Sequence, residues 1–315
     1  TTGDNNTAVG FEALKTVTTA SDNTAVGLSA LKLNTSGLQN TAVGGGVMAA
    51  NTSGARNTAV GYQSLDANTE GDDNTSFGRR SLSTNTTGSE NTAIGTQALA
   101  LNLTGSDNVA MGYNAGLSVT TGIQNTLIGT QAGDALTDAD DNVAVGKSAL
   151  SGDTLGSNSV AVGQATLANQ NFTTATDSNN VAVGYNAGNA VTTGINNTII
   201  GALAGDALTD ADYNVAVGTE ALGTDTLGNR SVAIGRKALA TQNFTTATSA
   251  YNVAMGYNAG VLITTGVQNT IIGSLSGDAL TDADFNTVLG YNALSTETLG
   301  SRSVAIGFQA LLDQN

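Results

Sequence analysis

The sequence predicts an all-β protein built as a parallel β-solenoid, in which short strands stack as successive coils of one chain. One glycine returns with a fixed period of seventeen from position 10 to 163 and, after gaps of twenty-one, from 184 to 235 and from 256 to 307. These positions mark eighteen coils, each seventeen to twenty-one positions long, and a fixed period along a chain is typical of stacked repeats. Proline is absent, as expected where nearly every strand must donate its backbone N–H groups.

The first element expected in each coil is a short strand that ends at the periodic glycine. An apolar residue always precedes the glycine, alanine stands one place earlier in 13 of 18 coils, and threonine or valine stands before that. Period-two alternation puts Thr7 and Val9 on one face and Ala8 on the other. We expect the alanine column to form a flat surface for another chain, and the threonine column to point inward, which disfavours ice binding.

A second short strand is expected after the glycine, followed by an Asn-Thr-x-Gly return loop. Asparagine stands four places before the glycine in 15 of 18 coils, and serine replaces it at Ser159, Ser231 and Ser303. This column has two interpretations, a ligand-binding ladder and a structural stack of amides. We favour the second, because stacked asparagine amides bond to one another along a fibre axis.

A longer repeat is superimposed on the shorter one. The sequence that starts at Asn108 returns at Asn180 and at Asn252, and the complete repeat contains three coils of the shorter length and one of the longer length. Residues 1–107 are plain coils of the shorter length, and residues 108–315 are three copies of this cassette, the last one incomplete. We find no linker or composition break, so the sequence predicts one continuous solenoid domain over 1–315. Because the pattern is cut at both ends, we expect it to belong to a longer protein.

The amino-acid composition argues against several classes of function. The chain has no cysteine, histidine or tryptophan, so it offers no Ser-His or Cys-His nucleophile and no thiolate metal site. The net charge of −15 argues against binding to nucleic acid or to anionic membranes. No apolar run is long enough for a membrane span. We expect no enzymatic activity and no cofactor, with carboxylate-catalysed polysaccharide cleavage as the remaining enzymatic alternative.

One acidic motif is a candidate calcium site. The sequence GDALTDAD occurs three times, and oxygen ligands at this spacing on a loop could hold Ca²⁺. The alternative is a solvated acidic turn that keeps the protein soluble. The candidate ligands are Asp134, Asp138, Asp140, Asp206, Asp210, Asp212, Asp278, Asp282 and Asp284.

Aromatic residues gather one place after the periodic glycine. They are open to two interpretations, a receptor-binding stripe and a cover over the seam between strands, and we favour the second. The longer loops around Phe172 and Phe244 are further candidates for recognition. The aromatic column contains Phe11, Tyr62, Tyr113, Tyr185, Tyr257, Tyr291 and Phe308.

Several repeats resemble those of known extracellular fibres. The segments Ser159–Gly163, Ser231–Gly235 and Ser303–Gly307, which read Ser-Val-Ala-Val/Ile-Gly, resemble the head repeat of YadA-type trimeric autotransporter adhesins. The sequence NTAVGYQSL at 57–65 is similar to repeats of bacteriophage tail-fibre proteins. The resemblance covers essentially the whole chain. It implies left-handed parallel β-rolls, three copies packed or intertwined as a homotrimer, in an extracellular fibre.

We therefore expect a structural role. The first hypothesis is the trimeric shaft of a bacteriophage tail fibre, whose host cell-surface receptor is bound through flanking regions. The alternative is the adhesive head of a bacterial trimeric adhesin that binds host matrix or glycan. The coil of this chain is longer than the adhesin head repeat, and the chain has no coiled-coil stalk or neck, which favours the phage fibre. Both hypotheses place the protein outside the cell, on a virion or on a bacterial surface.

Overall fold

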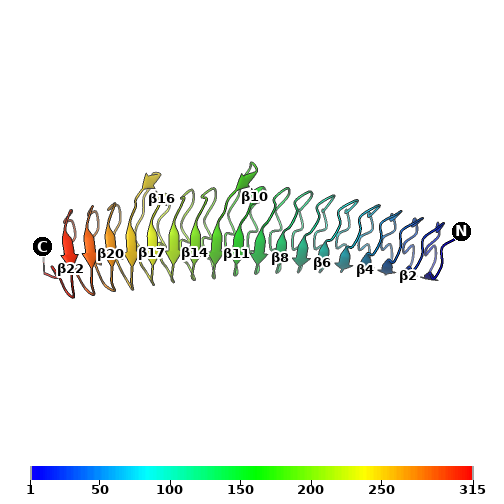
Figure 1. The fold of residues 1–315 in the computed structure, drawn as a ribbon, viewed down its shortest axis with the longest axis horizontal. Helices are drawn as coiled ribbons and strands as arrows, with labels where there is room; N and C mark the ends of the chain where they lie inside the picture. The colour runs from blue at the N-terminus through cyan, green and yellow to red at the C-terminus, as the bar shows by residue number, and fades with distance from the viewer. Residues whose placement is uncertain (1, 314–315) are drawn as a thin grey trace. The chain divides into compact units, whose positions relative to one another are not determined.

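The computed structural model describes residues 2–313 and confirms an all-β solenoid of parallel, stacked coils (Figure 1). No helix occurs among these residues. The chain divides into two compact units, which are described separately. The first unit contains the chain up to Ser157 together with Thr173–Ala175, and the second contains Asn158–Phe172 and the chain from Thr176 onward.

The first unit is built on nine three-residue strands, one in each coil. Consecutive strands pair in parallel and in register, so that Thr7 lies opposite Thr24 and Thr126 opposite Val143. A short additional strand, β10, follows the last coil. The strands are β1 (Thr7–Val9), β2 (Thr24–Val26), β3 (Thr41–Val43), β4 (Thr58–Val60), β5 (Thr75–Phe77), β6 (Thr92–Ile94), β7 (Val109–Met111), β8 (Thr126–Ile128), β9 (Val143–Val145) and β10 (Gly156–Ser157).

The second unit repeats this arrangement with nine more three-residue strands. Its pairing is also parallel and in register, for example Val181 opposite Thr198. It also contains three two-residue strands, of which β12 and β18 lie in the longer coils and β16 lies in a coil of the shorter length. The strands are β11 (Val160–Val162), β12 (Thr176–Asp177), β13 (Val181–Val183), β14 (Thr198–Ile200), β15 (Val215–Val217), β16 (Gly228–Asn229), β17 (Val232–Ile234), β18 (Thr248–Ser249), β19 (Val253–Met255), β20 (Thr270–Ile272), β21 (Thr287–Leu289) and β22 (Val304–Ile306).

The alanine column lies inside the coils, which corrects the expectation that it forms a surface for another chain. The middle residue is buried in every three-residue strand except β1, and Ala25 and Ala42 are fully buried. The first and third residues, such as Thr41 and Val43, face outward and are buried in none of these strands. The expectation that the threonine column points inward is therefore also wrong. The cause is steric, because the narrow interior admits a small residue beside the larger side chains of the turn.

The segment after each periodic glycine is a series of turns and not the second strand that we expected. In the first coil, Glu12 and Leu14 both have positive φ, at 58° and 49°. These left-handed residues break the period-two alternation, so that two consecutive side chains, for example Ala30 and Leu31, both point into the core. Hydrogen bonds to the next coil hold the turn, including that from Leu31 N to the carbonyl oxygen of Val47 at 3.0 Å.

The periodic glycine has a conformational and a steric reason. Gly61 has a φ of +128°, a region in which residues with side chains are strained. A Cβ atom on Gly61 would also lie 2.6 Å from the carbonyl oxygen of Gly78 in the next coil. Every coil must therefore return to glycine at this place, because the backbones of adjacent coils touch there.

The asparagine before each strand forms the structural amide ladder that we favoured. Asn57 donates from its backbone N to Asn40 Oδ1 at 3.0 Å and from its Nδ2 to the same oxygen at 3.1 Å. The same Nδ2 donates to the carbonyl oxygen of Gly71 at 2.8 Å. Both asparagines are fully buried, so the ladder satisfies polar groups along the inside of the coils.

The longer coil of the second unit forms a local projection. Strand β18 of this coil pairs in parallel with β16 of the preceding coil, and the ribbon stands out from the neighbouring coils beside the β16 label in Figure 1. Phe244, at the base of this projection, is only 5% exposed, and Phe172 is equally buried. The two phenylalanines therefore pack the loops and are not exposed recognition residues.

Candidate interaction surface

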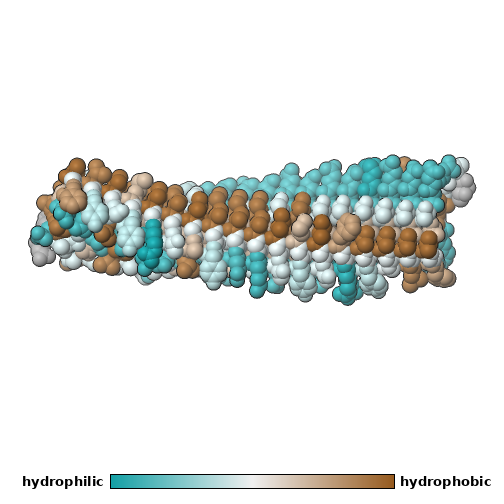
Figure 2. All heavy atoms as spheres, turned by 90° about the horizontal axis from the view of Figure 1, so that it is seen from below, coloured by the Kyte–Doolittle hydropathy of each residue, from teal (hydrophilic) through white to brown (hydrophobic). Residues whose placement is uncertain are grey.

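The most extensive candidate site is the outward face of the strands, which we call the outer stripe. It consists of the first and third residues of each three-residue strand. The third residue is apolar in every coil, yet none is buried, and Val43, Met111 and Leu289 are 37%, 42% and 45% exposed. Figure 2 shows a row of hydrophobic side chains along the face of each unit. A continuous apolar face of this kind is typical of an interaction site.

Two columns of side chains border the outer stripe. The entry column lies two residues before each strand and has positive φ in every coil, and the exit column directly follows the periodic glycine. In the first unit the entry column is Asn5, Asp22, Gln39, Arg56, Asp73, Glu90, Asp107, Gln124 and Asp141. Its exit column is Phe11, Leu28, Gly45, Tyr62, Arg79, Thr96, Tyr113, Thr130 and Lys147. The entry column is thus largely acidic, whereas the exit column contains no acid.

One ion pair links neighbouring coils within the entry column of the first unit. Arg56 Nε lies 2.7 Å from Asp73 Oδ1, and Arg56 Nη2 lies 3.3 Å from Asp72 Oδ2. The hydrogen bond from Arg56 lowers the pKa of Asp73 below its usual value. The charge of Arg56 is therefore compensated within the chain.

The second unit has a different entry column, which contains no acid and in which Arg230 lies between two aromatic residues. The guanidinium of Arg230 lies 5.0 Å from the ring centroid of Tyr213 and 5.9 Å from that of Tyr251. Arg230 Nη1 also donates to Ser249 Oγ at 2.9 Å. Among residues 2–313, no carboxylate forms an ion pair with Arg230. This arginine therefore presents an uncompensated positive charge between two exposed rings.

The aromatic residues of the exit column are exposed, so they do not cover a seam within the chain. Tyr62 is 56% exposed and Tyr113 is 52% exposed. In the second unit, Tyr291 stacks on Phe308 with their ring centroids 5.7 Å apart. These rings remain open to solvent, which is compatible with the receptor-stripe alternative.

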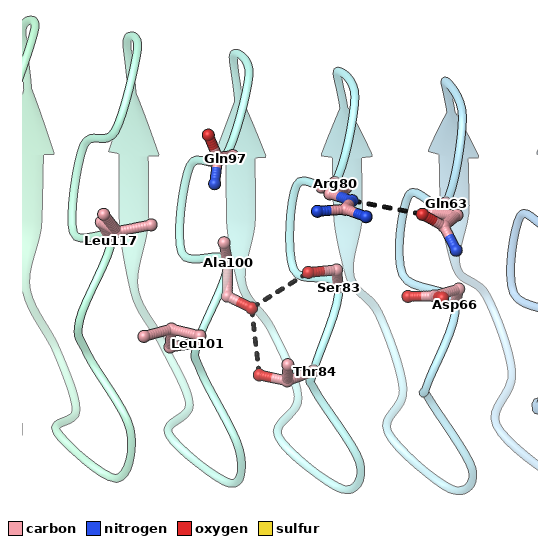
Figure 3. A pocket seen from close by; sticks show the side chains of 9 residues that line it. All are labelled: Gln63, Asp66, Arg80, Ser83, Thr84, Gln97, Ala100, Leu101 and Leu117. Atoms are coloured by element: carbon pink, nitrogen blue, oxygen red, sulfur yellow. Dashed lines mark hydrogen bonds between the residues drawn. The ribbon is translucent and has the colours of Figure 1, made fainter.

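An open groove of about 320 Å³ lies on the turns of the first unit (Figure 3). Its polar groups already bond to one another and to the backbone, since Arg80 Nε donates to Gln63 Oε1 at 3.2 Å and Thr84 Oγ1 donates to the carbonyl oxygen of Ala100 at 3.0 Å. Asp66 is its one carboxylate, whereas glycoside hydrolysis usually requires two. The groove is lined by Gln63, Asp66, Arg80, Ser83, Thr84, Gln97, Ala100, Leu101 and Leu117.

The nine predicted calcium ligands fall into two structural roles. Asp138 accepts a hydrogen bond from the hydroxyl of Thr121, and Asp140 Oδ1 accepts one from the backbone N of Ile123 at 2.7 Å. The equivalent residues do the same in the second unit. Asp210 and Asp282 accept from threonine hydroxyls at 2.6 and 2.5 Å, and Asp212 and Asp284 accept from backbone N–H groups at 2.8 Å.

The remaining three predicted ligands are half-buried in the turns after the glycine. Burial raises the pKa of Asp134, Asp206 and Asp278 above the usual value. Within residues 2–313, no three acidic, histidine or cysteine side chains come close enough to hold a metal ion. Calcium binding stays a prediction. The other six aspartates accept hydrogen bonds from the neighbouring coil, whereas Asp278 Oδ1 is buried without a hydrogen-bond partner among the described residues.

No protein-family model matches the sequence, and no curated protein is similar to it. In the part of the chain that the structure describes, no helix is long and apolar enough to cross a membrane. The surface chemistry described above is therefore the main basis for a function.

Proposed function

We propose that this protein is the structural shaft of a homotrimeric extracellular fibre, of the kind found in bacteriophage tail fibres. The observation that carries the proposal is the outer stripe. Every coil contributes one apolar side chain to it, and in each unit these side chains lie on a face that the fold leaves uncovered. Water contact along such a face is unfavourable, and packing against further copies of the same chain removes it.

Self-association also fits the quasi-one-dimensional construction of the coils. Each unit extends one strand at a time, with adjacent strands about 4.8 Å apart, so a contact made once per coil is repeated along the unit. Packing around a common axis lets every copy bury the same face. The resemblance of the repeats to trimeric fibres favours three copies over two.

The mechanical role follows from the same features. Continuous backbone hydrogen bonds and buried amide ladders join each coil to the next, and bending the unit would strain many of these contacts together. A stiff shaft of this kind holds a receptor-binding region away from the base of the fibre. In this proposal the host receptor is bound by flanking regions.

Light scattering tests the proposal directly. We expect a mass near three times 31.2 kDa, because three copies bury their outer stripes together. The variant Val43→Glu/Ile94→Glu places charges on the stripe and is expected to reduce the mass to that of one chain. Thr87→Glu, at an exposed loop position away from the stripe, is the matched control and should stay trimeric. A native chain with the mass of one or two copies would contradict the proposal.

The second candidate function is adhesion, and the Tyr213–Arg230–Tyr251 ladder favours it. An exposed guanidinium held between rings has a planar edge for carboxylate or sulfate groups, as in an acidic glycan of a host matrix. Heparin is a suitable probe. Arg230→Gln should weaken binding about tenfold or more, whereas Arg56→Gln should change little because Arg56 is already paired with Asp72 and Asp73. Equal binding by both variants would remove this candidate.

A further inference from the structure

The edges of the outer stripe in the first unit contain cations without a partner in the chain. Among residues 2–313, ion pairs involve Lys15, Lys32, Arg56 and Lys237. The exposed exit-column cations Arg79 and Lys147 take part in none of them. Their positive charges are therefore available to carboxylates outside the chain.

In the coil of each of these two cations, two consecutive aspartates lie at the opposite edge of the outer stripe. In the coil of β5, Asp72 and Asp73 precede the strand and Arg79 follows it. In the coil of β9, Asp140 and Asp141 precede the strand and Lys147 follows it. The two charged edges of each coil thus have opposite sign.

A third coil shows complementary chemistry of another kind. In the coil of β4, the entry residue is Arg56 and the exit residue is Tyr62, which is 56% exposed. An aromatic ring is a suitable partner for a guanidinium. The second unit does not share the charge pattern, since Arg230 and Arg236 stand at both edges of the β17 coil, so the inference concerns the first unit.

The complementary residues of one coil cannot meet within one chain. Asp141 and Lys147 stand on opposite sides of the extended strand β9, and extended backbone advances about 3.3 Å per residue. They therefore lie at opposite ends of the strand, up to about 20 Å apart. An ion pair requires contact within about 4 Å. The opposite charges at the two edges of a coil can therefore form ion pairs only between different molecules.

We propose that the entry column of one copy contacts the exit column of the next copy, coil by coil. Asp141 then faces the partner's Lys147. The partner's Arg79 faces the cluster of Asp72 and Asp73, which keeps one excess negative charge after both have paired with Arg56 of their own chain. This inference rests on the proposed fibre. Rotation about an axis parallel to the stacking direction turns every outer stripe toward the axis and brings opposite edges of neighbouring copies together. Such a head-to-tail contact between different edges closes into a ring.

The charge pattern also sets the register of the copies. When equal coils lie side by side, Asp73 and Asp141 each face a cation. A shift by one coil in one direction would place Asp73 opposite Thr96 and Arg56 opposite the like-charged Arg79. A shift in the other direction would pair Glu90 with Arg79 but place Asp141 opposite Thr130, so one of the two pairs would be lost. The apolar stripe alone repeats in every coil and cannot exclude such a shift, so the edge charges supply the specificity.

Cysteine crosslinking tests the contact, because the chain has no cysteine of its own. We expect Asp141→Cys/Lys147→Cys to form covalent trimers with an oxidant or a short bismaleimide, as seen on a non-reducing gel. The single variants Asp141→Cys and Lys147→Cys should remain uncrosslinked. The matched control Asp141→Cys/Tyr113→Cys moves the second thiol by two coils, about 10 Å along the stack, and should crosslink far less.

The outcomes separate this contact from the fibre itself. A mass of three chains by light scattering, without crosslinking of the double variant, would overturn the edge contact and leave the trimer standing. Crosslinking by a single variant would overturn it as well, because that result indicates a two-fold contact between equal edges. A monomeric mass would overturn the proposed function and this contact together.

Charge reversal provides a second measurement that needs no crosslinker. Asp141→Lys alone should lower the fraction of trimer, because it places two cations in contact, and Asp141→Lys/Lys147→Asp should restore it. Restoration distinguishes pairing from a simple loss of folding. A double variant as impaired as the single one would contradict the contact.

Discussion

A coil of the plain repeat and a coil of the cassette fill the same interior with different residues. In the coil of β6, the strand contributes the small Ala93 and the turn contributes the large Leu99. In the coil of β8, the strand contributes Leu127 and the turn contributes Gly133. A Cβ atom on Gly133 would lie 2.7 Å from Leu127 Cδ2. In both coils one large and one small residue fill the interior. The large residue comes from the turn in the coil of β6 and from the strand in the coil of β8.

The interior residues of the return loop also differ between the two kinds of coil, being polar in the plain coils and apolar in two cassette coils. In the plain coils a second buried amide ladder runs through Asn34, Asn51, Asn68, Asn85 and Asn102. In the cassette coils Val119 and Leu136 take this place. Where the ladder stops, Asn102 Oδ1 is buried and has no hydrogen-bond partner. A polar ladder is thus stable in its middle and unsatisfied at its end.

The largest loss of folding stability is expected when a large core residue of a cassette coil is removed. Leu127→Ala removes a fully buried side chain beside a glycine, so no neighbour can fill the space, and it should destabilise the protein by about 2–5 kcal/mol. The double variant Leu127→Ala/Gly133→Leu restores the plain-coil residues at these two positions, whereas Leu136 stays, and it should recover part of the loss. Leucine is compatible with the backbone there, since Leu99 has a φ of 49° at the equivalent position. Denaturant unfolding measures both, and a double variant less stable than Leu127→Ala would refute the exchange.

A smaller effect is expected from the plain-coil ladder. Asn68 donates to Asn51 Oδ1 at 2.8 Å and accepts from Asn85 Nδ2 at 2.9 Å, so Asn68→Ala breaks two ladder bonds. The expected cost is about 1–3 kcal/mol. Asn102→Ala is the matched comparison, because it breaks one ladder bond and removes the unpaired oxygen. Thermal unfolding should rank Asn68→Ala as the less stable variant, and the reverse order would show that ladder continuity is unimportant.

The smallest change in folding stability is expected when a half-buried aspartate of the cassette coils is replaced. Burial raises the pKa of Asp134 above 3.8, so the folded state holds this proton more tightly than the unfolded state. Its contribution to stability is therefore greatest below about pH 3.8 and is lost as the pH rises through the folded pKa. Asp134→Asn should raise the stability at neutral pH by about 0.5 kcal/mol and change little in acid.

Asp73, in the plain coils, supplies a control of opposite sign. Arg56 lowers the pKa of Asp73, so this contribution is present above about pH 3.8 and is lost as the pH falls through the folded pKa. Asp73→Asn should therefore reduce stability at neutral pH. Melting temperatures measured from acid to neutral pH would contradict the assignment if both variants shifted in the same direction.

The strands were predictable because their signal is local. The glycine period located all eighteen three-residue strands, and the stacking of Asn40 and Asn57 followed from the properties of asparagine amides. The turns were not predictable, because non-glycine residues such as Glu12 and Leu14 seldom adopt positive φ. Their conformation depends on hydrogen bonds to the next coil, and a single repeat does not reveal them.

The candidate surface was predictable only in part. The alternation of Thr7, Ala8 and Val9 showed that threonine and valine share one face, but it did not show which face is inside. The apolar stripe was therefore assigned to the alanine face, which the structure buries. The groove around Asp66 was missed because its residues come from neighbouring coils and share no motif.

By itself the sequence determined the period, the strand positions and the placement of glycine, because each depends on the geometry of one coil. Only the tertiary structure decided which face is buried, how the turns run and which charges lack a partner. The physical reason is that these properties depend on the neighbouring coil. Ala25 is buried because large side chains of the turn, such as Leu31, also occupy the interior, and that leaves the valines and threonines outside.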